Sequence, residues 1–245
     1  MKSKLSYMVV VAGMALASMG AHAAWNWQLD GTPTGTDLPG TASVMGYSAS
    51  SNTAVLVATN ATGLPDLNWY SGGYGICSTG DTPCGDAPEH AMDNNGYKES
   101  IVLSFVGKMV TLSSLNIGWA GADSDMSVLA YTGTGTPVSG SSTYGNLLTN
   151  GWSLVGQYAN VSTSTNLNLG TALSSSYWLI AAYNSTFGGT CTGGTCGDGN
   201  DYVKLFAVAG NTSPNGKVPE PAVLLLFGTA LMGVVGLRRR RQTEN

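Results

Sequence analysis

Short apolar and β-branched stretches recur along the middle of the chain, separated by clusters of Gly, Ser, Thr and Asn. In 100–105, alternate positions place Ile101, Leu103 and Phe105 on one face. No segment of this region has a sustained 3.6-residue period. The pattern predicts an all-β domain, an antiparallel β-sandwich with jelly-roll-like connections. Its expected strands are Ala42–Tyr47, Ala54–Thr59, Ser100–Phe105, Val110–Trp119, Met126–Tyr131, Trp152–Tyr158, Ser162–Leu169, Tyr177–Tyr183 and Tyr202–Ala209.

The stretch from Val110 to Trp119 departs from clean alternation. In a regular strand, Leu112 and Asn116 would share one face while Leu115 and Ile117 would lie on the other. Such a strand would divide its apolar side chains between core and solvent. We therefore expect an irregular strand here or one with a β-bulge.

The N-terminus has the order of a secretory signal peptide. Two lysines precede an apolar run from Leu5 to Met19, and Ala21-His22-Ala23 follows it. Small residues in an A-x-A arrangement are typical of a cleavage site, here between Ala23 and Ala24. We expect 1–23 to be removed on export, which leaves His90 as the histidine of the mature domain.

A second apolar run, 222–237, lies near the C-terminus and contains no charged residue. As a helix it would be about 24 Å long, slightly short of a hydrocarbon core of about 30 Å. The run predicts a transmembrane helix that begins after the two prolines of the preceding segment. Four arginines follow it as a stop-transfer signal: Arg238, Arg239, Arg240 and Arg241. On physical grounds alone this could also be an ordinary single-pass anchor.

The order of these C-terminal parts resembles the PEP-CTERM sorting signal of Gram-negative bacteria. Val218, Pro219, Glu220 and Pro221 stand before the apolar segment, and the arginine cluster closes it. The resemblance implies recognition of the Pro-Glu-Pro motif by exosortase, a membrane-embedded, cysteine protease-like transpeptidase that cuts nearby. It further implies that the protein is released or transferred to the cell surface. The family's hosts typically make exopolysaccharide and biofilm matrix.

The predicted organisation is a signal peptide (1–23), an extracytoplasmic domain (24–210), a polar linker (211–217) and the sorting signal (218–241). A looser resemblance to exosortase-dependent surface proteins covers 89–209 and implies no catalytic residues. Between Asp30 and Asp201 the chain has twelve acidic residues, and no arginine precedes Arg238. Without a basic stripe to neutralise phosphates, nucleic-acid binding is excluded.

The four cysteines form two local pairs, Cys77 with Cys84 and Cys191 with Cys196. Export to an oxidising compartment predicts disulfides, for which three connectivities are possible. We favour the two local pairings because each pair brackets residues that turn easily. A zinc site is the weaker interpretation, since neither spacing is C-x-x-C.

Asp- and Asn-rich loops offer hard oxygen ligands that suit calcium. The richest of them precedes the predicted strand at 100–105. The alternative is that these residues make turns by bonding their own backbone. The candidate ligands are Asp93, Asn95, Asp123, Asp125, Asp198 and Asp201.

Aromatic residues are the other candidate binding groups. Trp69 and Tyr70 lie among Gly, Asn and Ser, which makes them candidates for stacking against sugar rings. Trp119 and Trp178 lie in apolar strands and are expected in the core. His90, in a loop, is expected to be exposed rather than catalytic.

These observations predict an exported, exosortase-processed surface or extracellular-matrix protein that is not an enzyme and is associated with exopolysaccharide or biofilm. The first alternative is a carbohydrate-binding module, with calcium as its one candidate cofactor, and the second is a secreted hydrolase using His90. The expected partners are exosortase, the inner membrane transiently, and exopolysaccharide. The precursor is expected to be membrane-anchored and the mature form to lie at the surface or outside the cell.

Overall fold

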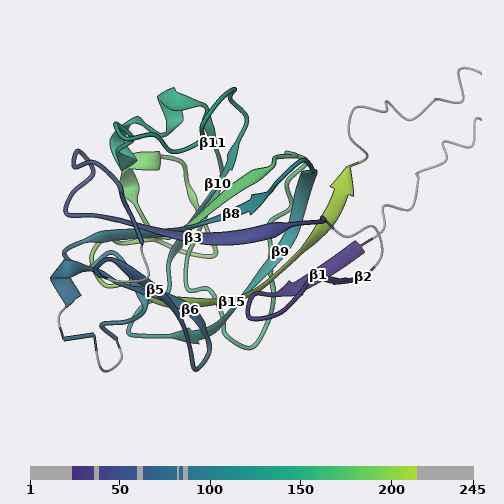
Figure 1. Ribbon diagram of the computed structural model, residues 1–245. Helices are drawn as coiled ribbons and strands as arrows, with labels where there is room; N and C mark the ends of the chain where they lie inside the picture. The colour runs from purple at the N-terminus through teal and green to yellow at the C-terminus, as the bar shows by residue number, and fades with distance from the viewer. Residues whose placement is uncertain (1–23, 36–38, 60–62, 82, 85–87, 214–245) are drawn as a thin grey trace, which may run out of the picture. The chain divides into compact units, whose positions relative to one another are not determined.

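The computed structural model describes residues 24–35, 39–59, 63–81, 83–84 and 88–213 (Figure 1). The predicted signal peptide, the helix expected at 222–237, the Pro-Glu-Pro motif and the arginine cluster lie outside these residues. Within the described part of the chain, no helix is both long and apolar enough to cross a membrane.

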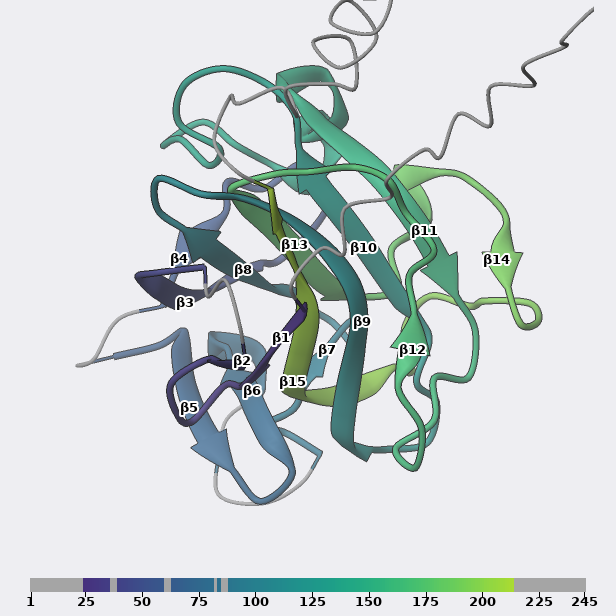
Figure 2. The same cartoon turned by 90° about the vertical axis from the view of Figure 1, so that its right-hand side faces the viewer.

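Two β-sheets make up the described domain (Figure 1). The β15 sheet contains, in order, β12 (Leu167–Asn168), β9 (Met109–Ala120), β15 (Tyr202–Ser213), β1 (Ala24–Gln28) and β2 (Thr34–Gly35). Next to β15 it also holds β6 (Gly73–Cys77), β7 (Met92–Asp93) and, beyond β6, β5 (Asp66–Tyr70). Figure 2 shows β9 running beside β15, with β12 on its outer side.

The β10 sheet has the order β14 (Cys191–Thr192), β11 (Trp152–Tyr158), β10 (Met126–Tyr131), β13 (Tyr177–Ala182), β8 (Lys98–Phe105), β3 (Ala42–Ala49) and β4 (Val57–Ala58). Its strands pair antiparallel, except that β14 runs parallel to β11. In the connections that the structure describes lie the short 3₁₀ helices η1 (Thr79–Asp81), η2 (Tyr144–Asn146), η3 (Leu148–Asn150) and η4 (Ser185–Phe187).

The predicted all-β class is confirmed, while the jelly-roll connectivity stays a prediction. Of the expected strands, 54–59 and 162–169 shorten to the two-residue strands β4 and β12. The strands β1, β5 and β6 were not predicted; each is five residues long. The last strand, β15, continues to Ser213, three residues into the expected linker, because it pairs with β9 as far as Met109.

The main core lies between the two sheets. From the β10 sheet it receives Ile101, Leu103 and Phe105, the three residues that the alternation of this strand predicted to share a face. From the β15 sheet it receives Trp25 and Trp27, which alternate with exposed residues along β1. Burial of such large apolar side chains removes water from both inner faces and stabilises the sandwich.

A second apolar cluster covers the outer face of the β10 sheet. It includes Val102, Leu129 and Leu179, which alternate along their strands with residues of the main core. Tyr144 and Phe187, from two of the 3₁₀ helices, close over this face. The sheet is therefore buried on both sides, which explains why β10 is apolar or small at every position instead of alternating.

The irregularity predicted for the strand at 110–119 is a bulge. The register of β9 against β15 shifts between the pairs Ala209–Ser114 and Gly210–Leu112. The shift turns both Leu112 and Leu115 toward the core, and both are buried. One extra residue thus resolves the conflict in the hydrophobic pattern.

Candidate functional site

Among the residues that the structure describes, acidic side chains, most of them buried, form two groups. Asp81, Asp93 and Glu99 form one group, here the Glu99 cluster. Asp123, Asp125 and Asp201 form the other, here the Asp125 cluster. In each, one oxygen from every residue lies within 4.8 Å of the others. Four of the predicted calcium ligands are thus divided between two places, and two residues of the Glu99 cluster were not predicted.

The Glu99 cluster joins three segments, one from each sheet and one from the loop after β6. Asp81 ends η1, inside the loop closed by the first disulfide, while Asp93 ends β7 and Glu99 is the second residue of β8. The three residues are 4%, 1% and 2% exposed, so their charges are removed from water. Burial of this kind is costly unless the charges are neutralised or fully hydrogen-bonded.

Hydrogen bonds satisfy the Glu99 cluster only in part. Asp81 Oδ2 accepts from the backbone N–H and the hydroxyl of Ser78, at 2.7 and 2.6 Å. Asp93 Oδ1 accepts from the N–H of Asn95 at 2.8 Å, and Glu99 Oε2 accepts from the N–H of Asp93 at 3.1 Å. Glu99 Oε1 is buried and has no hydrogen-bond partner among the described residues.

The protonation equilibria of this cluster reflect its uncompensated charge. Burial, followed by the charge of Asp81, raises the pKa of Asp93 to about 8. Burial and the neighbouring charges of Asp93 and Asp81 raise the pKa of Glu99 well above its ordinary value. Lys98 opposes the rise at Asp93, but its ammonium donates to the carbonyl of Asn94 at 2.6 Å.

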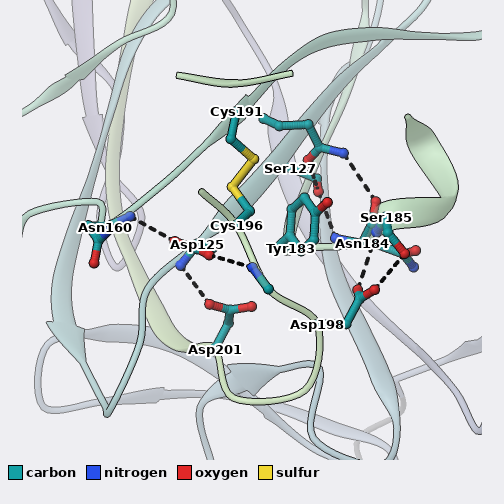
Figure 3. The surroundings of a disulfide bond; sticks show 12 residues. Asp125, Ser127, Asn160, Tyr183, Asn184, Ser185, Cys191, Cys196, Asp198 and Asp201 are labelled. Atoms are coloured by element: carbon teal, nitrogen blue, oxygen red, sulfur yellow. Dashed lines mark hydrogen bonds between the residues drawn. A yellow bond between two sulfur atoms is a disulfide. The ribbon is translucent and has the colours of Figure 1, made fainter. Parts of the chain in front are cut away.

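The Asp125 cluster is held by donors on several loops (Figure 3). Asp125 Oδ1 accepts from the N–H of Asn160 at 2.8 Å, and its Oδ2 accepts from the N–H of Gly197 at 3.0 Å. Asp201 Oδ1 accepts from the N–H of Asp125 at 2.8 Å, and its Oδ2 from the amide of Asn94 at 2.6 Å. Each oxygen of these two side chains is therefore occupied by a donor.

The carboxyl group of Asp201 has a raised pKa. Burial raises its pKa to about 7, with smaller upward contributions from Asp125 and Asp123 and opposing hydrogen bonds from Asp125 and Asn94. A protonated Asp201 can donate to a neighbouring carboxylate, which relieves the repulsion between them. The arrangement tethers the loops at 160 and 197 to the start of β10.

The two remaining predicted ligands lie outside both clusters. Asn95 is exposed, and its side-chain amide donates to the hydroxyl of Tyr202 at 2.6 Å. Asp198 is also exposed and accepts from the backbone N–H and the hydroxyl of Ser185 (Figure 3). Asp198 therefore tethers its loop to η4, 13 residues away along the chain, and the bonds given for it are not turns within its own backbone.

The two local disulfides predicted from the sequence are present, Cys77–Cys84 and Cys191–Cys196. Each adjoins one acidic cluster. Asp81 lies within the first disulfide loop, and Gly197, a donor to Asp125, follows Cys196 directly. The disulfides thus fix the loops that supply one member or one donor to each cluster.

His90 is buried rather than exposed, which corrects the expectation from its loop position. Its Nε2 lies 2.9 Å from the amine of Lys204, and its ring lies 4.1 Å from that of Tyr70. Lys204 is itself buried and lies over the rings of Tyr70 and Trp119. Burial lowers the pKa of Lys204. Among the described residues, the contacts given for the Lys204 amine are with His90 and with aromatic rings, and none is with a carboxylate.

The candidate sugar-binding pair has two separate environments. The ring of Trp69 packs on Tyr74 at 5.3 Å and on Phe206 at 5.6 Å, whereas Tyr70 packs on His90. Both residues are half-buried. Sugar contact stays a prediction for each of them, but they do not present one shared platform. Of the two tryptophans expected in the core, Trp178 is fully buried and Trp119 is only half-buried, over Lys204.

A shallow pocket of about 270 Å³ lies at the edge of the second apolar cluster. Two tyrosines, Tyr131 and Tyr177, line it together with the hydroxyl residues Thr132 and Ser176. Its volume is just below the usual range for small-molecule sites, so it would hold a single sugar ring or a group of similar size. No pattern in the chain indicated this pocket, because its residues come from three separate segments.

Sequence reasoning missed Asp81 and Glu99 as cluster members for different reasons. Asp81 stands between two cysteines, where a turn was the simpler interpretation. Glu99 is the second residue of a strand whose following residues are buried, and an acidic residue there is an indication of a polar site inside the fold. The bends that bring η1 against β7 and β8 are not visible in the sequence.

Comparison with known proteins assigns the tail of the chain. Residues 217–241 match the family model of the PEP-CTERM protein-sorting motif, which confirms the predicted signal. Searches of curated proteins and of solved structures gave no match. The motif marks the chain for export and for processing by exosortase at the cell envelope. It covers the sorting tail and leaves the activity of the β-sandwich unassigned.

Proposed function

We propose that this is a non-enzymatic surface or extracellular-matrix protein, associated with exopolysaccharide and biofilm, whose β-sandwich is delivered by exosortase. The observation that carries the proposal is the sorting motif at 217–241, which follows a disulfide-stabilised domain. Disulfides suit an extracellular position, where thiols are oxidised. The mature protein is then the described domain with a short C-terminal remnant.

A structural role is supported by the surroundings of His90. Its ring contacts the amine of Lys204 and the ring of Tyr70, and its Nδ1 has no hydrogen-bond partner among the described residues that would orient it as a general base. The acidic residues of the Asp125 cluster are likewise occupied by backbone donors. These contacts favour a rigid domain over a hydrolase.

Intact-mass analysis of the surface-exposed protein tests the sorting step. In cells with exosortase, we expect a C-terminus near Pro219–Pro221, and in cells without it the full C-terminus. Pro221→Ala should abolish the processing, while Pro214→Ala, a proline upstream of the motif, should leave it intact. An uncut C-terminus in wild-type cells would identify an ordinary membrane anchor and contradict the proposal.

A carbohydrate-binding role is the second candidate, and the partly exposed rings of Trp69 and Tyr177 favour it. Polysaccharide from the host is the appropriate probe, in a pull-down with the surface-exposed protein. Loss of retention in Trp69→Ala would locate binding at the β5–β6 hairpin, and loss in Tyr177→Ala would locate it at the pocket. Equal, negligible retention of the wild type and both variants would reject this role.

A further inference from the structure

We propose that the Glu99 cluster is a calcium site, with Asp81, Asp93 and Glu99 as its carboxylate ligands. The proposal concerns the folded domain alone and does not depend on the sorting function. It revises the ligand set expected from the sequence: Asp93 is kept, Asp81 and Glu99 are added, and Asn95 is left out.

The geometry of the cluster fits one ion. Two oxygens on opposite sides of a calcium ion are separated by about 4.8 Å, twice a bond length of about 2.4 Å. One oxygen from each carboxylate lies within 4.8 Å of the other two, as ligands of a common ion must. Bidentate binding allows three carboxylates to supply most of the oxygens that calcium takes.

The unpartnered oxygen of Glu99 is a second and independent indication. This side chain is 2% exposed, and its Oε1 has no hydrogen-bond donor among the described residues. A buried carboxylate oxygen normally accepts at least one bond, and leaving it without a partner is costly. A cation between the three carboxylates would supply the missing partner and offset the charge repulsion.

The donor set selects the kind of ion. Among the described residues, this place gathers three carboxylates without a thiolate or an imidazole, which suits a hard cation better than zinc. Magnesium usually keeps several of its waters, and the near-complete burial of all three residues leaves little room for them. Calcium, which is bound through many protein oxygens, fits better.

The Asp125 cluster provides an internal control. It has the same number of carboxylates within the same limit of 4.8 Å, but backbone and amide donors occupy the oxygens of Asp125 and Asp201. In the Glu99 cluster, by contrast, a buried oxygen has no donor among the described residues, and its charge is still to be neutralised. Protons shared between the carboxylates are the rival means of neutralising it.

The test is calcium binding to the full-length protein, exported so that both disulfides form, purified in mild detergent and stripped with a chelator. Calorimetric titration with calcium chloride at pH 7.5 should give one site per chain. Glu99→Gln should weaken that binding at least a hundredfold, while Asp123→Asn, from the other cluster, should bind like the wild type. Circular dichroism without calcium shows whether each variant is folded.

A second measurement covers the case in which Glu99→Gln fails to fold. Terbium binds calcium sites, and its emission is excited through nearby aromatic rings; the ring of Tyr97 lies against Gly80, next to Asp81. The wild type should show sensitised emission that calcium displaces, and Tyr97→Leu should reduce the emission without loss of calcium binding. Absence of bound calcium in the folded wild type, or equal binding by Glu99→Gln, would overturn the proposal in favour of shared protons.

Discussion

The Glu99 and Asp125 clusters are alike in composition and differ in how their charge is accommodated. In the Asp125 cluster, backbone N–H groups from the loops at 160 and 197 occupy both oxygens of its central carboxylate. In the Glu99 cluster, donors occupy one oxygen of each residue, and Glu99 Oε1 is left without one. The hydrogen bonds of the Asp125 cluster hold loops together, whereas the Glu99 cluster retains a buried oxygen that is available to an ion.

The difference teaches that counting acidic residues does not identify a metal site. The number of donors that already reach the carboxylates decides between the two outcomes, because a saturated oxygen gains little from a cation. Donors come from backbone segments that lie far away along the chain, such as Gly197 for Asp125. The comparison can be tested by substituting, in turn, the carboxylates and the disulfides on which it depends.

The largest effect is expected for Asp125→Ala. The change leaves the N–H groups of Asn160 and Gly197 without their acceptor, which should lower the free energy of unfolding by about 3 kcal/mol. Urea denaturation, with and without calcium, measures it. The loss should be the same in both conditions, and Asp30→Ala, at an exposed position, should have no effect. A loss that calcium reverses would mean that this cluster also binds the ion.

Removal of a disulfide is expected to cost about 2 kcal/mol, because each closes a short loop. The two should differ in their effect on calcium. Replacing Cys77 and Cys84 by Ser should also weaken calcium binding at least tenfold, since Asp81 lies in that loop. Replacing Cys191 and Cys196 should not, although it loosens the donor next to Asp125. Calorimetry of both double variants compares them, and the opposite result would exchange the roles of the clusters.

The free energy of unfolding should depend on pH through the titration of Asp201 in the Asp125 cluster. The pKa of Asp201 is raised to about 7 in the folded protein, from an ordinary value near 4. The folded state therefore binds more protons than the unfolded state between these values, so this contribution is complete below about pH 4 and is lost as pH rises through 7. From pH 5.5 to 6.5 it can lower the free energy of unfolding by up to about 1.4 kcal/mol.

Asp201→Asn removes that contribution and is the control for it. Urea denaturation of both proteins, in the presence of a chelator, should show a shallower decline with pH in the variant. Parallel curves would mean that Asp201 is ionised in the folded protein throughout this range.

The smallest effect is expected for Asp198→Asn. This exposed residue bonds to Ser185, a contact that should be worth less than about 0.5 kcal/mol, since solvent competes for both groups. Calcium binding should also be unchanged. A weakened calcium affinity would instead place the ion at the loop between the second disulfide and β15.

Much of the fold could be predicted from the sequence, because apolar alternation and burial are local consequences of side-chain chemistry. Ile101, Leu103 and Phe105 share the core face as predicted, and the disturbed pattern around Leu112 corresponds to a bulge. The short strands escaped prediction because their pairing partners, not their own residues, define them. For β7 that partner is β15, far along the chain.

The sequence predicted which types of residue would form the candidate site, but it did not predict which of them would lie together. Asp93 was expected among calcium ligands, yet its neighbours turned out to be Asp81 and Glu99. Asp123, Asp125 and Asp201 were expected as ligands too, and hydrogen bonds to loop backbone hold two of them. Trp69 and Tyr70 are adjacent in sequence but pack on different partners.

The sequence by itself determined the β-rich class, the local disulfide pairs and the sorting tail, because each depends on residues that are near one another along the chain. Only the tertiary structure decided which carboxylates meet and which of their oxygens find donors. Those contacts join segments such as Asn94 and Asp201, which lie 107 residues apart. Their free energies depend on burial and on the geometry of distant backbone, and neither is encoded in any single stretch of the chain.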